Sequence, residues 1–91
     1  MDHDSTQAQV AALARQIRVE LVSRSMLHQD LADAIPVSHS AMSHYMTALR
    51  PIPMPTFIRI AEVLGVKPSE LLGRAAELPP ERAAGTGAAL P

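Results

Sequence analysis

The chain has no cysteine and no tryptophan, and aromatic residues make up only 2% of its 91 residues. The absence of cysteine excludes disulfide bonds and thiolate metal sites. With so few aromatic side chains, the core has to be built from aliphatic residues and methionine, a composition that favours short helices over a sheet. Because 91 residues supply one small core, we expect a single all-α domain.

Long apolar runs and an excess of one charge are also missing. No run approaches the roughly 20 apolar residues that a membrane-spanning helix needs, and the opening MDHDSTQAQ is acidic and polar, unlike a secretory signal. We therefore expect a cytoplasmic protein without membrane contact. The net charge of −1 argues against binding nucleic acid without sequence preference, because such binding depends on Lys and Arg.

The two ends of the chain are expected to lie outside the folded domain. Apolar residues at helical spacing begin at Val10, and Thr6 with Gln9 fits a capping box for the helix that contains them. Residues 77–91 have no apolar period. We therefore expect a flexible segment at 1–7, the folded domain at 8–76 and a disordered tail at 77–91.

Helix-breaking residues divide the domain into five predicted helices. After the first, a short helix over 28–35 has to end before Pro36, since the residue before a proline is disfavoured in the α conformation. Ser38 is a good N-cap for a third helix over about 39–48. A fourth runs from near Pro55 to Gly65, and a fifth begins at Pro68 and ends at Gly73.

The third helix has two contrasting faces. At 100° per residue, an arc of about 100° holds the apolar side chains expected in the core, which are Met42, Tyr45, Met46 and Leu49. An arc of about 140° on the other side holds only short hydrogen-bonding groups, which are His39, Ser40, Ser43, His44 and Thr47.

The polar face can be interpreted as merely solvated or as a binding surface. Solvated helix faces are normally filled by Glu, Lys, Gln and Arg, which are better helix formers than Ser, Thr and His. Short donors and acceptors instead suit close approach to a partner, and the major groove of DNA, about 12 Å wide, admits such a helix.

Two stretches carry a family resemblance. LADAIPVSHSAMSHYM resembles the second helix, turn and recognition helix of the lambda repressor and Cro family, also called the xenobiotic-response-element family, and IRIAEVLGVKPSELL resembles its last two helices. The resemblance covers Ile17 to Leu72 and implies a compact five-helix domain with a helix-turn-helix, which binds operator DNA as a dimer.

The same resemblance assigns the residues that contact DNA. The base-reading positions fall at the start of the third helix, a phosphate clamp falls at the start of the second, and a backbone contact falls in the loop that follows the third. The expected DNA-binding residues are His28, Gln29, Ser38, His39, Ser40, Ser43, His44, Thr47 and Arg50. Since the third helix contains no Lys or Arg, neutralisation of phosphates is expected from Arg50, Arg24, Arg18 or Arg59, or from protonated histidine.

An enzyme is not expected. The serines have no recognisable His and carboxylate partners, and His39 and His44 diverge by about 140° on a helix, so they do not converge on a metal. We expect neither a metal nor a cofactor.

The sequence therefore predicts a sequence-specific transcriptional regulator, a repressor that binds double-stranded DNA as a homodimer. The expected dimer surface lies near Leu71, Leu72 and the RPIPMP loop, where apolar groups remain once the helices are packed. The alternative is a protein-interaction module, such as an antitoxin that holds a toxin through its tail or its apolar loop.

Overall fold

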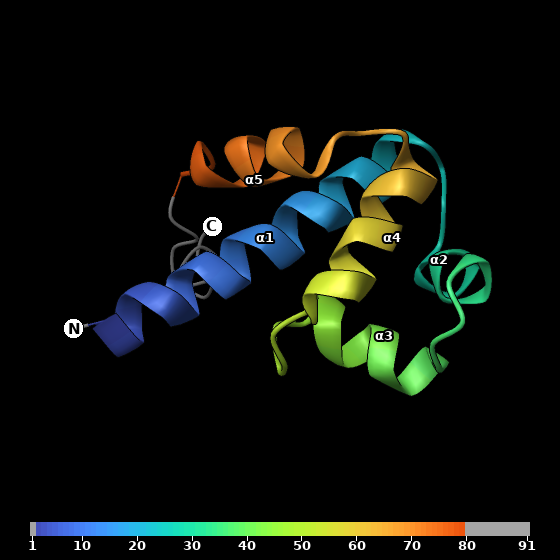
Figure 1. The fold of residues 1–91 in the computed structure, drawn as a ribbon, viewed down its shortest axis with the longest axis horizontal. Helices are drawn as coiled ribbons and strands as arrows, with labels where there is room; N and C mark the ends of the chain where they lie inside the picture. The colour runs from blue at the N-terminus through green and yellow to red at the C-terminus, as the bar shows by residue number, and fades with distance from the viewer. Residues whose placement is uncertain (1, 80–91) are drawn as a thin grey trace, which may run out of the picture.

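The computed structural model describes residues 2–79, which form five α-helices and no strand (Figure 1). The predicted all-α class is therefore confirmed for this part of the chain. Most of the expected disordered tail, residues 80–91, lies outside the described residues. None of the helices within 2–79 combines the length and the apolar character of a membrane-spanning segment.

The first helix, α1, spans Asp2–Ser23 and is longer than predicted. It begins before Thr6, so Thr6 and Gln9 lie within the helix and the expected start after residue 7 is wrong. Acidic residues are favourable in the first turn of a helix, because they face the positive end of the helix dipole. The sequence has two acidic residues, Asp2 and Asp4, in the segment that we expected to be flexible.

Helices α2 (His28–Ala34) and α3 (His39–Met46) are short and pack against each other. Pro36 ends α2 as predicted, since Ile35 is extended at φ −117° and ψ 127°. The Ser38 hydroxyl caps α3 by accepting a hydrogen bond from the Ala41 amide at 3.0 Å. Both boundaries follow from local chemistry that is visible in the sequence.

The end of α3 differs from the prediction. The helix stops at Met46, and Ala48 takes a left-handed conformation with φ 62°. This turn carries the next residue out of the helical register. Leu49, expected in the core, is 71% exposed.

Helix α4 spans Met54–Leu64 and is closed by Gly65, whose φ of 73° is easy for glycine. Helix α5 begins at Pro68 as predicted but runs to Ala76, so Gly73 lies inside it. A glycine in a helix costs only about 1 kcal/mol relative to alanine. Burial of Ala75 against the rest of the domain favours continuing the helix past Gly73.

The core lies between the five helices, each of which contributes buried side chains. Helix α1 packs on α5 and α3, and α4 packs on α5 and α2. The largest side chains that are fully buried are aliphatic or methionine, as the composition predicts: Ile17, Leu21, Leu31, Met42, Met46, Ile60 and Leu71.

A charged cluster joins α1 to α5. Glu20, only 6% exposed, accepts hydrogen bonds from Arg24 at 2.7 Å, from Arg74 at 2.8 Å and from Gln16 at 2.7 Å. Burial by itself raises the pKa of this carboxyl, but the hydrogen bonds from Arg24, Arg74 and Gln16 outweigh it and lower the pKa from 4.5 to about 2. The ionised form of Glu20 therefore stabilises the fold.

Glu20→Gln is expected to lower the free energy of unfolding at pH 7 by about 1–3 kcal/mol, which is less than the full pKa shift implies because both arginines are partly solvated. Since the folded pKa lies below the unfolded value, the stabilisation is present above pH 4.5 and is lost as the pH falls towards about 2. Urea unfolding of both proteins at pH 7 and pH 2.5 measures the difference. Equal stability of the two proteins at pH 7 would contradict this role.

Candidate nucleic-acid interface

The two faces of α3 divide between core and solvent. Met42, Tyr45 and Met46 are buried. The polar side chains lie on the other face: His39, Ser40, Ser43 and Thr47 are exposed and His44 is half-buried. Except for Leu49, the division follows the helical period.

Two of the expected hydroxyl contacts, those of Ser38 and Thr47, are partly used within the fold. The Ser38 oxygen accepts the capping hydrogen bond, which leaves its hydroxyl hydrogen available to a partner. The Thr47 hydroxyl donates to the carbonyl of Ser43 at 2.9 Å, which leaves Thr47 as an acceptor. Ser40 and Ser43 make no side-chain hydrogen bond to any described residue, so donor and acceptor are both free in each.

His39 pairs with a residue of α2. Its Nε2 lies 2.8 Å from Oδ1 of Asp33. Both side chains are largely exposed, 59% for His39 and 70% for Asp33. Asp33 was not among the predicted site residues, since a contact across the turn at Pro36 depends on how α2 and α3 pack and leaves no pattern in the sequence.

The remaining predicted residues flank α3. His28 and Gln29 are exposed in the first turn of α2. Arg50 is exposed four residues beyond the end of α3, in the loop that leads to α4. The structure thus puts all three on the surface of elements that contact or follow α3, and their side chains make no hydrogen bond within residues 2–79.

Two of the arginines expected to neutralise phosphates are used inside the domain. Arg18 donates from α1 to the carbonyl of Met46 and so satisfies a free carbonyl at the end of α3. Arg24 pairs with Glu20. Among the four arginines considered, only Arg50 and Arg59 are exposed without a side-chain partner in residues 2–79.

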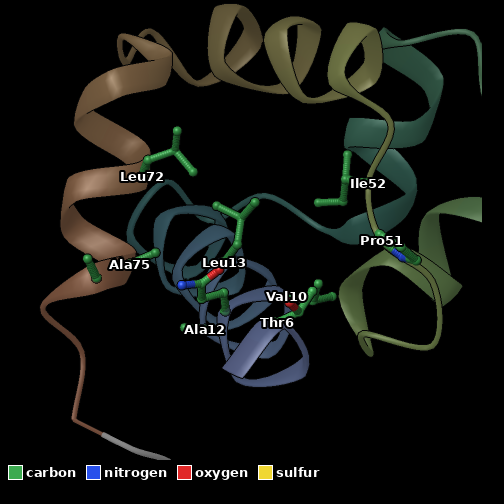
Figure 2. Close-up of a pocket in the computed structure, with 10 residues that line it drawn as sticks. Thr6, Val10, Ala12, Leu13, Pro51, Ile52, Leu72 and Ala75 are labelled. Carbon is green, nitrogen blue, oxygen red and sulfur yellow. The ribbon is translucent and has the colours of Figure 1, made fainter. Parts of the chain in front are cut away.

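A groove lies between α1, α5 and the loop before α4. It has a volume of about 320 Å³, and Leu13, Ile52 and Leu72 point into it from these three elements (Figure 2). Leu72 is 47% exposed, but Leu71 is fully buried. The expected placement of Leu71 on a dimer surface is therefore wrong, because that side chain belongs to the core.

Comparison with known proteins supplies no relative: no family model, no curated protein and no solved structure matches the chain. Within residues 2–79, no group of three or more His, Asp or Glu side chains is placed to hold a metal ion.

Proposed function

We propose that this protein is a sequence-specific DNA-binding regulator, in which α2 and α3 form a helix-turn-helix of the lambda repressor kind and α3 reads bases in the major groove. The observation that carries the proposal is the outer face of α3. It exposes short hydroxyl and imidazole groups, while Met42, Tyr45 and Met46 hold its other face in the core.

The contacts around α3 favour a rigid reading element. Ser38 caps the start of the helix, and Arg18 holds a carbonyl at its end. Groups that read bases have to be held in a fixed orientation, because base-edge hydrogen bonds depend on geometry. Short side chains on a fixed helix satisfy that requirement better than long, mobile ones.

The charge distribution favours recognition with few phosphate contacts. Arg50 is the exposed cation nearest in sequence to the polar face of α3. Phosphate contacts supply the part of the affinity that does not depend on sequence. A monomer with so few free cations is expected to bind weakly, so we propose that a homodimer binds two half-sites about 34–36 Å apart.

Ser40→Ala and Arg50→Ala are expected to impair DNA binding in different ways. Both are compared with the parent on a DNA site that the parent selects. Loss of the Ser40 hydroxyl relaxes discrimination by about 1–3 kcal/mol at one or two base pairs. Loss of Arg50 weakens binding to all sequences alike and lowers the salt slope by about 1 per monomer.

Fluorescence anisotropy with the selected site and with random DNA, at several salt concentrations, separates these effects. Ser69→Ala on α5, also an exposed serine, is the matched control and leaves binding unchanged. If Ser40→Ala weakens binding to the selected site and to random DNA equally, Ser40 does not read a base.

A further inference from the structure

The hydrogen bond between Asp33 and His39 determines which nitrogen of the imidazole ring carries a hydrogen. A carboxylate only accepts hydrogen bonds, so the 2.8 Å contact requires the Nε2 atom of His39 to carry a hydrogen. In a neutral imidazole, the other nitrogen then has no hydrogen and acts only as an acceptor. In the neutral ring, Asp33 thus makes Nδ1 of His39 an acceptor.

The His39 side chain is partly open to a partner. In residues 2–79 the only hydrogen bond of the His39 side chain is the one to Asp33, and 59% of that side chain is exposed. His39 is the first residue of α3, directly before Ser40. Its ring therefore belongs to the surface that we propose to read DNA.

The major groove offers such an acceptor only two kinds of donor. Adenine presents its N6 amino group and cytosine its N4 amino group, whereas the groove edges of guanine and thymine present acceptors. We propose that Asp33, which itself touches no base, is a specificity-determining residue: by pairing with His39 it restricts the base opposite His39 to adenine or cytosine. This inference rests on the proposed function.

Asp33→Asn is expected to remove the restriction on the base opposite His39, and it hardly changes the shape of the side chain. The asparagine amide can accept from Nε2 or donate to it, so both neutral forms of the ring become available and Nδ1 can also donate. Guanine and thymine are then expected to become acceptable at that position, while the other positions of the site stay unchanged. A merely structural role of Asp33 would change affinity or stability, not the base at one position.

The test is a selection of bound sequences from a random double-stranded DNA pool at pH 8, where an ordinary histidine is neutral. It uses the parent, Asp33→Asn, His39→Ala and the double variant. The parent is expected to favour adenine or cytosine over guanine or thymine at least about fivefold at one position per half-site. Asp33→Asn is expected to reduce this preference to less than about twofold, and His39→Ala to remove it.

The double variant separates the effect of Asp33 on base preference from the effect of its negative charge on overall affinity. Asp33→Asn also removes a negative charge, so it is expected to raise affinity for all sequences, with or without His39. In the His39→Ala background it should change no base preference.

Three results would overturn the inference while the proposed function stands: guanine or thymine preferred by the parent opposite His39, an unchanged preference in Asp33→Asn, or a change of preference that persists without His39. If the parent selects no sequence at all, the proposed function fails and the inference fails with it.

Discussion

Ser43→Glu is expected to weaken DNA binding at least about 100-fold and to leave the fold intact, which corresponds to about 3 kcal/mol of binding free energy. Ser43 is exposed on the polar face of α3, and its side chain has no hydrogen-bond partner in the described residues. DNA carries one negative charge per about 1.7 Å of its axis. A carboxylate at 4 Å from a single phosphate already costs about 1–4 kcal/mol, depending on how far the contact is solvated.

Ser69→Glu is the matched control. Ser69 is also exposed, and it lies on α5, on the opposite side of the domain from α3 (Figure 1). Both variants add the same side chain and the same charge. Anisotropy measures DNA binding, and circular dichroism with thermal melting checks the fold. Equal loss of binding in the two variants would mean that net charge, and not the α3 surface, controls the interaction.

Leu71→Ala is expected to destabilise the domain by about 2–5 kcal/mol, because it removes a fully buried side chain and leaves a cavity. For a domain of this size the melting temperature should fall by roughly 8–40 °C. The neighbouring Leu72 is 47% exposed in the groove, and Leu72→Ala should cost less than about 1 kcal/mol. Urea unfolding of the two variants measures both values; similar losses would contradict the assignment of Leu71 to the core.

Leu72→Ala also tests whether the groove forms the contact of the proposed homodimer. If the groove contributes to the homodimer, Leu72→Ala weakens association while the monomer stays folded. Sedimentation equilibrium of the parent and Leu72→Ala measures the dissociation constant. An unchanged constant would place the dimer contact elsewhere on the domain.

The elements that could be predicted from the sequence are those set by local chemistry. Pro36 ends α2, Ser38 caps α3 and Gly65 closes α4, because each effect involves only residues within one turn. The division of α3 into a buried and a polar face follows from its period alone. The predicted end of α5 was wrong because the local signal was weak. Gly73 was expected to end the helix, but α5 continues through it to Ala76.

The contacts that complete the candidate site could not be predicted because they depend on how helices pack. Arg18 reaches the carbonyl of Met46 across 28 positions of the chain, and Asp33 reaches His39 across the turn at Pro36. Neither pair has a periodic spacing. Leu49 was placed in the core by a helical period that Ala48 interrupts, and a left-handed alanine leaves no signal in the sequence.

Selection from a random double-stranded DNA pool, with the parent and Ser43→Glu in parallel, tests most directly whether α3 reads DNA. The parent is expected to enrich one short motif, repeated with twofold symmetry at a spacing of about 10 base pairs. Ser43→Glu, with the same fold, is expected to enrich none. A parent that enriches no motif, or a Ser43→Glu variant that enriches the parent's motif equally well, would contradict the proposal that the polar face of α3 is a DNA-reading surface.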